Sequence, residues 1–453
     1  MHSPEIADHA GRPSVALPGE RFRPIQYLGN KTRLLDDIGS FMAEMTSPEE
    51  RIADLFSGTA VVAGRLGTRN PVTAVDVQAY SEVLARASLI ARRDDFTEFD
   101  HIRFNADVAI AVERLSQVFG DLVEREARAL TELAAGNVWP MYQIIESSSP
   151  LAMASRGGET SLSAAVRAML ENDTPDLPDA TATITFGGVY FSFDQALRLD
   201  ALADVISRQP KKRQSVLTAA LLGVASEIVN TVGKQFAQPI QLIDRAGRPK
   251  ALLIRRTLRD RNLPVDDLFK RWLQRWLGSI QSDFADHRVV RAPVEQFLST
   301  SHDCTAFYAD PPYTIDHYSR FYHVLETLVL RDRPRLARMR KGGRDTVMRG
   351  LYREERHQSD YCIPSKAPAA FDKLFRATSA KAGKLLLSYS GHAAPGEQRP
   401  RLIPVDDLIL MARRHFVSVS VVEPTFGGHR KLNAAHRNAA TERGTERFII
   451  CRS

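Results

Sequence analysis

The chain has 453 residues, of which 43% are hydrophobic and 25% charged, and it carries a net charge of +7. This length exceeds what one hydrophobic core usually organises, so two domains are expected. No apolar run approaches the roughly 20 residues of a membrane span, and the mild basic excess points only weakly to a polyanionic partner.

The first residues and the cysteines both bear on where the protein works. Residues 1–20 contain charged side chains and no apolar core, which predicts a flexible lead-in and not a signal peptide. Cys304, Cys362 and Cys451 stand far apart, without a CxxC pair or any metal-ligand spacing. This pattern fits a reducing cytoplasm and predicts neither disulfides nor a bound metal.

A turn followed by a helix is predicted over residues 24–38. Gly29-Asn30 marks a tight turn, and the apolar residues after it recur at helical spacing. Lys31 lies where the turn becomes helix, but the upstream glycine of a phosphate-binding Walker A loop is missing. Taken alone, this segment indicates a surface turn more readily than a binding site.

Residues 51–76 predict one nucleotide-binding half of a doubly wound sheet. A short strand that includes Asp54-Leu55-Phe56, a turn at Gly58 and the start of a helix follow one another. A second strand then ends at Asp76, where a carboxylate can accept both hydroxyl groups of a ribose.

The glycine turn favours one ligand over another. Ala60 stands at the second glycine position of the dinucleotide fingerprint, so the close backbone approach that a pyrophosphate needs is not provided. An adenosine without phosphates, as in S-adenosylmethionine, makes no such demand. The pattern therefore favours S-adenosylmethionine over NAD, with a ligand-free α/β unit as the alternative.

Helical periodicity dominates between about residues 100 and 300. Ser192 and Gln195 predict a capping box at the start of one helix. The aromatic stretch 184–193 is expected to be a strand or an extended segment. Trp272 and Trp276, one helical turn apart, indicate core packing, with nucleic-acid contact as the alternative.

The α/β pattern resumes with a buried strand that runs into Asp310-Pro311-Pro312-Tyr313. Each proline locks φ and removes an N–H, so this loop holds a carboxylate, stiff carbonyls and an aromatic ring in fixed places. Such a loop could grip a planar base by its exocyclic amino group. A strand end followed by an ordinary Pro-Pro turn is the alternative.

A basic run follows this loop. Clustered arginines are what phosphate contacts need, although a solvated loop or helix face is an equally reasonable reading. Further buried strands are predicted at 384–390, 415–422 and 447–451, the last two as the antiparallel strands that end such sheets. The basic side chains predicted to bind DNA are Arg331, Arg333, Arg335, Arg338, Arg340 and Lys341.

Together these motifs resemble the alpha group of adenine-specific (N6) DNA methyltransferases, the Dam-like class. QYLGNK at 26–31, DLFSGT at 54–59, Asp76 with Tyr80-Ser81, and ADPPY at 309–313 are similar to its cofactor and catalytic motifs, in the alpha order. The helix at Tyr322–Thr327 is closer still to members from restriction–modification systems. Tyr27 stands where the Dam type carries Trp, and the middle of the chain matches poorly.

The resemblance implies a fold, a domain division and a reaction. The fold would be a Rossmann-like, S-adenosylmethionine-dependent methyltransferase sheet interrupted by a largely helical target-recognition domain. Residues 21–105 and 296–453 would form the catalytic domain, and 106–295 the recognition insert. The enzyme would methylate an adenine flipped out of double-stranded DNA. It would act as a monomer without membrane attachment, with a cognate restriction endonuclease as a possible partner.

The resemblance also assigns residue roles. Asp310 and the Pro311 carbonyl would accept the two amino hydrogens, Pro312 would stiffen the loop, and Tyr313 would stack on the base. An amino methyltransferase of RNA or of protein glutamine, and a non-catalytic DNA-binding subunit of the same fold, are the alternatives. The residues implied to bind the cofactor are Tyr27, Gly29, Lys31, Asp54, Phe56, Gly58, Asp76 and Asp310.

Overall fold

The computed structural model describes most of the chain, and the predicted lead-in 1–20 lies outside its described residues. No helix within the described part combines the length and the apolar character needed to cross a membrane. The described ranges are 22–27, 29–147, 149–156, 162–171, 177–280, 286–315, 318–341, 344–381, 383–390, 402–424 and 446–453.

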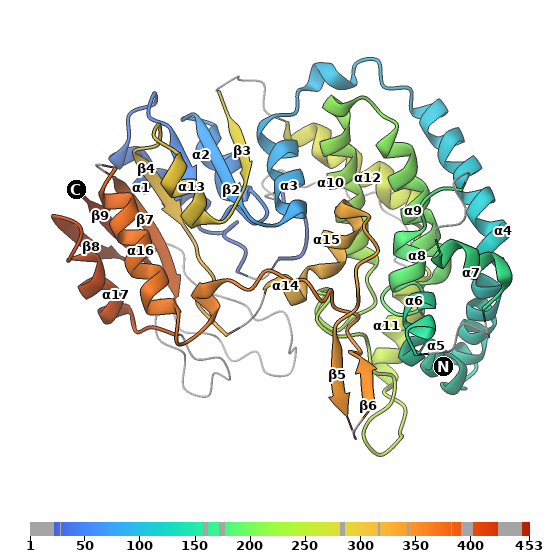
Figure 1. Ribbon diagram of the computed structural model, residues 1–453. Coiled ribbons are helices and arrows are strands. Elements are labelled where there is room, and N and C mark those ends of the chain that lie inside the picture. Colours follow the sequence, from blue (N-terminus) through green and yellow to red (C-terminus); the bar gives the residue numbers. More distant parts are fainter. Residues whose placement is uncertain are drawn as a thin grey trace, which may run out of the picture.

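A seven-stranded sheet in the order β3-β2-β1-β4-β7-β9-β8 forms one side of the molecule (Figure 1). The first five of these strands run parallel, whereas β9 is antiparallel to both β7 and β8. The predicted α/β fold class and the antiparallel end strands are therefore confirmed. The strands are β1 (Ile52–Asp54), β2 (Val72–Asp76), β3 (Arg288–Arg291), β4 (Ala306–Ala309), β7 (Lys384–Ser390), β8 (Ser418–Val422) and β9 (Glu446–Arg452).

Helices cover both faces of the sheet because the side chains of its strands alternate between two apolar cores. Ala306 and Tyr308 of β4 join the core under α1 and α2, and Phe307 and Ala309 join the core under α13, α16 and α17. The helices around the sheet are α1 (Leu35–Met45), α2 (Val61–Gly67), α3 (Ala79–Leu89), α13 (Val294–Thr300), α16 (Ala367–Ser379) and α17 (Val405–Ala412).

The largest apolar core lies in the helical part and continues through α3 and α15, so it joins the two parts of the molecule. Trp272 and Trp276 are buried in it, which confirms their predicted packing role, and the Ser192–Gln195 capping box is present. The helices of this part are α4 (His101–Ala134), α5 (Trp139–Ser147), α6 (Pro150–Ala154), α7 (Ala164–Leu170), α8 (Thr181–Phe186), α9 (Phe193–Ser207), α10 (Lys211–Ile228), α11 (Ala251–Arg261) and α12 (Val265–Ser279).

The expectation of an extended segment at 184–193 was wrong, because its first residues end the buried helix α8. The Asp200 carboxylate accepts the N–H groups of Ala182 and Thr183, each at 2.8 Å, and so caps the first turn. The β-branched residues of this stretch favour a strand locally. A buried cap supplied from α9 outweighs that preference.

Two segments after the sheet's fourth strand pack on the helical part. These are the helices α14 (Tyr318–Phe321) and α15 (His323–Leu330), and the hairpin of β5 (Arg338–Lys341) and β6 (Arg344–Val347). The hairpin projects beside the loop between α10 and α11 (Figure 1). Arg349 joins the two, since its Nη1 and Nη2 donate to the carbonyls of Pro239 and Ile240 at 2.8 Å. The strand β3 lies within residues 106–295, the range expected to form the recognition insert, but it pairs with β2 and so belongs to the sheet.

Candidate active site

The strand order reverses between β1 and β4, and ligands of open α/β sheets bind at the carboxyl ends of the strands at such a point. Asp54 ends β1, Asp76 ends β2, and Asp310 follows β4. A cavity of about 230 Å³ lies at this edge, and Asp76 and Asp310 both line it. The topology therefore brings together three carboxyl groups that lie far apart in the chain.

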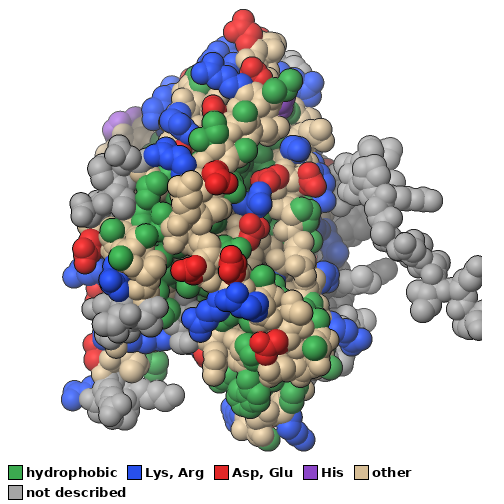
Figure 2. Space-filling model, turned by 90° about the vertical axis from the view of Figure 1, so that its right-hand side faces the viewer, with side chains coloured by type: hydrophobic (Ala, Val, Ile, Leu, Met, Phe, Trp, Pro, Cys, Tyr) green, Lys and Arg blue, Asp and Glu red, His purple; other side chains and the backbone are tan. Residues whose placement is uncertain are grey.

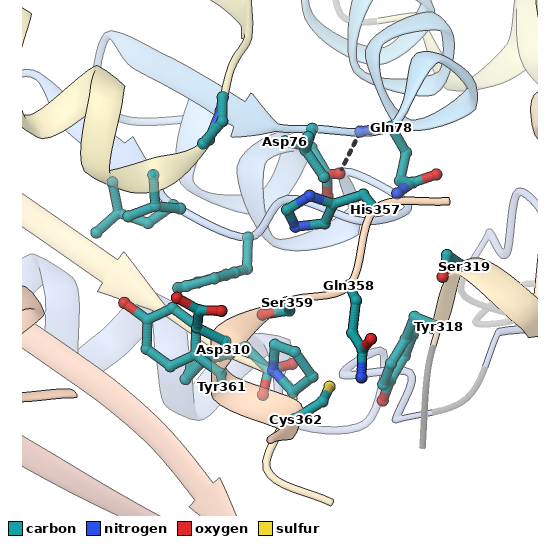
Figure 3. Close-up of a pocket in the computed structure, with 18 of the residues that line it drawn as sticks. Asp76, Gln78, Asp310, Tyr318, Ser319, His357, Gln358, Ser359, Tyr361 and Cys362 are labelled. Carbon is teal, nitrogen blue, oxygen red and sulfur yellow. Dashed lines mark hydrogen bonds between the residues drawn. The ribbon is translucent and has the colours of Figure 1, made fainter. Parts of the chain in front are cut away.

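Asp76 is held in place by the backbone around it. Its Oδ2 accepts the N–H of Gly58 at 2.9 Å, and its Oδ1 accepts the N–H of Gln78, also at 2.9 Å (Figure 3). Burial raises the pKa of the Asp76 carboxyl, and the N–H groups of Gln78 and Gly58 oppose that rise. The carboxylate is thus fixed toward the cavity, and each oxygen can accept a further hydrogen bond.

Gly58 is required at its position for two reasons. Its φ of +51° lies in the left-handed region, and a Cβ there would lie only 3.0 Å from the hydroxyl oxygen of Tyr27. Tyr27 lines the cavity, and its ring stacks on that of Tyr322 with centroids 4.7 Å apart. The glycine turn and the amino-terminal segment that carries Tyr27 therefore fit against each other.

Asp54 lies beneath the cavity and is absent from its lining. Its side chain is buried, and burial raises the pKa of its carboxyl to about 8, with Asp310 and Asp76 contributing further. At neutral pH Asp54 therefore holds its proton. This limits the negative charge that accumulates where three strand-end carboxyl groups meet.

Lys31 is buried at the centre of the site, so the segment Gly29-Asn30-Lys31 is not a surface turn. Its Nζ lies 2.9 Å from Asp310 Oδ2 and 3.2 Å from Glu446 Oε1, with 3% of its side chain exposed. Burial alone would lower the pKa of Lys31, but the Asp310 and Glu446 carboxylates raise it well above its usual value. One ammonium group is thus shared between two carboxylates.

Glu446 is the main charged residue of the site that the sequence reading did not identify. It is the first residue of β9, which runs antiparallel to β7, so it reaches the edge where the parallel strands end. Ser388 Oγ donates to its Oε1 at 2.5 Å, and Glu446 is buried. No local pattern around Glu446 marks it, because its neighbours Lys31 and Asp310 come from other parts of the chain.

The DPPY loop forms one wall of the cavity. Pro311, Pro312 and Tyr313 all line it, and the Tyr313 ring packs on Tyr389 with centroids 5.2 Å apart. Lys31 Nζ lies 5.8 Å from the centre of the Tyr313 ring. These contacts fix the Tyr313 end of the loop, while the loop residues still line the cavity.

The segment His357–Cys362, which the sequence did not mark, forms another wall (Figure 3). Tyr361 from this segment packs edge-on against Phe56, with ring centroids 5.2 Å apart, and Tyr318 lines the cavity from α14. The segment follows the β5–β6 hairpin in sequence. A strand or helix pattern could not have indicated it, because its first three residues are irregular and its last three form a single turn of 3₁₀ helix.

Glu326 of α15 holds the start of α3, which directly follows the Asp76 loop. Its two carboxylate oxygens accept the N–H groups of Ala79 at 3.0 Å and Tyr80 at 3.2 Å, which are the first residues of α3. A negative charge at a helix amino terminus is favourable. This cap gives a physical reason for the glutamate in the Tyr322–Thr327 motif.

Of the residues implied to bind the cofactor, five line the cavity: Tyr27, Lys31, Phe56, Asp76 and Asp310. Gly29, Asp54 and Gly58 are absent from the lining, although Gly58 contacts the lining residues Tyr27 and Asp76. Gly29 has a φ of +70°, and a Cβ there would lie 3.3 Å from the Tyr318 hydroxyl.

The arginines predicted to bind DNA are mostly paired with carboxylates. Arg340 is exposed, and the side chain of Lys341 lies outside what the structure describes. Pairing offsets their charge, so their contact with DNA stays a prediction. The pairs are Arg331 and Arg333 with Asp179, Arg335 with Glu354 and Glu355, and Arg338 with Asp345.

Two comparisons with known proteins agree with the motifs. Residues 27–112 match the family model of D12 class N6 adenine-specific DNA methyltransferases. The chain is also 25% identical over 421 residues to the Modification methylase LlaI of Lactococcus lactis subsp. lactis. That match covers 90% of this chain and 51% of the relative, so the chain spans about half the length of the curated relative it matches. The resemblance to adenine-specific DNA methyltransferases is confirmed.

Proposed function

We propose, with this resemblance as the premise, that the chain methylates the exocyclic N6 amino group of a specific adenine in double-stranded DNA. One observation carries the proposal: a single cavity at the switch point of the sheet is lined by Asp76 and by the rigid loop from Asp310 to Tyr313. Asp76 could bind a ribose, and the loop could bind an amino group. An enzyme that transfers a group from a nucleoside cofactor to a base needs both.

The residues present fit S-adenosylmethionine as the methyl donor. The Asp76 carboxylate faces the cavity with acceptor capacity for two ribose hydroxyls, and Tyr27 and Phe56 offer aromatic surface for an adenine ring. We assign these three side chains to the cofactor, with Asp310 and Lys31 beside them and Gly29, Asp54 and Gly58 as their support. When bound, the cofactor supplies an electrophilic methyl group.

The DPPY loop supplies the acceptors for the base. Asp310 accepts one hydrogen of the amino group, and the Pro311 carbonyl accepts the other. Two acceptors in fixed positions favour a pyramidal nitrogen with its lone pair free to react, so positioning provides much of the rate. Tyr313 stacks on the base once it has left the duplex. Lys31, which stays charged, keeps Asp310 oriented.

The two parts of the molecule would have different roles. We propose that residues 21–105 and 296–453, with β3 added, bind the cofactor and carry out the reaction. The rest of 106–295 would recognise the target sequence, and the basic run Arg331 to Lys341 would contact the DNA backbone. A monomer would suffice, because a flipped base is presented by one strand at a time.

The printed name of the relative, a modification methylase, supports a restriction–modification setting with a cognate restriction endonuclease as functional partner. RNA or a protein glutamine amide as substrate, and a non-catalytic DNA-binding role, are the competing functions. The complete DPPY loop in the cavity favours an active enzyme over the last of these.

Incubation with tritiated S-adenosylmethionine and duplex DNA, RNA or protein extract separates these functions. We expect label in duplex DNA, and sequencing of methylated adenines in the product would give the target site. Label found only in RNA or protein would overturn the proposal. Asp310→Ala should lose at least about a hundredfold in methylation rate while still binding the cofactor, because a fixed transition-state acceptor is removed.

A further inference from the structure

Two arginines that are sequence neighbours of cavity-lining residues are arranged differently from the others in this region. Arg320 directly follows Ser319, and Arg356 directly precedes His357, and both of these neighbours line the cavity. Both arginines are half-buried. Their guanidinium carbons lie 4.7 Å and 5.2 Å from the centre of the same ring, that of Tyr352.

The Tyr352 ring that carries them is fixed. It is buried, its hydroxyl donates to the carbonyl of Ala237, and Gln238 Nε2 donates to that hydroxyl at 2.9 Å. The chain passes so close that a Cβ on Gly350 would lie 2.3 Å from the ring. The two guanidinium groups are therefore held on a rigid platform that joins the catalytic loop region to the loop between α10 and α11.

Within the described residues, neither guanidinium has a carboxylate partner. Arg320 makes one long contact of 3.4 Å to the Tyr352 hydroxyl, and the buried Nη1 of Arg356 has no hydrogen-bond partner there. Nearby Arg353 and Arg349 are paired, with Asp332 and Glu146 respectively. Two cations brought together without an anion form an arrangement that a bound anion would stabilise.

We propose that Arg320 and Arg356 bind one phosphodiester of the substrate DNA strand, next to the nucleotide whose base enters the cavity. This inference rests on the proposed function. A guanidinium group presents several N–H donors in a plane that matches phosphate oxygens, and stacking on an aromatic ring leaves the donors other than the buried Nη1 of Arg356 available. Burial and the neighbouring Arg320 also lower the pKa of Arg356, which a phosphate would reverse.

The outer side of the helical part offers no comparable site. Figure 2 shows basic, acidic and hydrophobic side chains intermixed over this face, without a continuous basic surface among the described residues. A polyanion gains little from such a mixture. Among its described side chains, this face therefore offers DNA no continuous basic surface that would compete with Arg320 and Arg356.

The test compares Arg320→Gln, Arg356→Gln and the double variant with Arg65→Gln. Arg65 is a matched control, since it is also half-buried but lies on α2, outside the parts proposed to contact DNA. Binding to a duplex oligonucleotide that carries the methylated site is measured by fluorescence anisotropy across salt concentrations. The plot of log K against log salt has a negative slope. In the double variant its magnitude should be smaller by about 0.9, as expected for one lost phosphate contact.

The affinity of the double variant should fall roughly 10- to 100-fold, with each single variant in between, as for the loss of charge-assisted hydrogen bonds. Cofactor affinity, measured by calorimetry, should not change, and Arg320→Lys with Arg356→Lys should keep the salt slope. A wild-type slope in the Arg320→Gln and Arg356→Gln variants, or an equal loss in Arg65→Gln, overturns the phosphate site. If the wild-type protein neither binds nor labels duplex DNA, the proposed function itself fails.

Discussion

Lys31→Met is the substitution that tests the architecture of the site most directly. In the native protein one buried ammonium group lies 2.9 Å from Asp310 Oδ2 and 3.2 Å from Glu446 Oε1. Methionine has a similar length and no charge, so the substitution leaves two buried carboxylates without their cation. We expect the folded state to lose stability because of the charges that are left, more than because of the lost packing.

The magnitude follows from the two distances. At an effective dielectric constant of about 20, each attraction is worth roughly 5–6 kcal/mol, and burial of the ammonium costs several kcal/mol. Removing one partner of a buried pair typically destabilises a protein by about 3–5 kcal/mol. We expect a loss in this range near neutral pH, and a smaller loss under acidic conditions, where one carboxyl group can take up a proton.

Urea unfolding followed by circular dichroism provides the assay. Adding Glu446→Gln to Lys31→Met should restore at least about half of the loss, because the two positions are coupled and one uncompensated carboxylate is removed. Lys384→Met is the matched control. Its ammonium lies 2.7 Å from Glu50 Oε1, but about a third of its side chain is exposed (34%), so solvent screens the pair. Its loss should be only about 0–1 kcal/mol.

Two results would refute this reasoning. One is a loss for Lys31→Met no larger than that for Lys384→Met. The other is strict additivity of Lys31→Met and Glu446→Gln, which would mean that the ammonium and the Glu446 carboxylate do not interact. Because Lys31 keeps its charge up to a pH above its usual pKa, alkaline conditions below about pH 10 should not reproduce the effect.

Three further substitutions have defined outcomes. Asp54 keeps its proton in the folded protein up to about pH 8 but loses it near 3.8 when unfolded, so its burial lowers stability as pH rises through this window. In Asp54→Asn, the free energy of unfolding should decline with pH less steeply, by up to about 1.4 kcal/mol per pH unit. The same dependence of that free energy on pH in both proteins would contradict this. Gly58→Ala, at φ +51° and 3.0 Å from the Tyr27 hydroxyl, should cost about 1–2 kcal/mol in thermal unfolding and weaken cofactor binding. Asp76→Asn should reduce cofactor affinity about 10- to 100-fold by calorimetry, since an amide offers one acceptor oxygen where the carboxylate has two; unchanged affinity would remove Asp76 from the cofactor site.

Local pattern was sufficient for the elements and motifs that lie within one short stretch. The strand that ends at Asp76, the capping box at Ser192 and the antiparallel strands β8 and β9 follow from side-chain periodicity and capping chemistry, and the structure has them. The expectation of an extended stretch at 184–193 was wrong for its first residues, which end α8. Asp200 from a later helix caps the start of α8, and such a hydrogen bond from a distant residue leaves no mark in the local sequence.

The sequence by itself therefore determined the fold class, the DPPY loop and the acidic residue at the end of β2, because each depends on residues adjacent in the chain. Only the tertiary structure decided that Lys31 lies between Asp310 and Glu446, that His357–Cys362 forms one wall of the cavity, and that Arg320 and Arg356 share one ring. The physical reason is the topology of the sheet. It places the ends of parallel strands and the start of an antiparallel one at a single edge, so distant residues meet there without any mark in their local sequence.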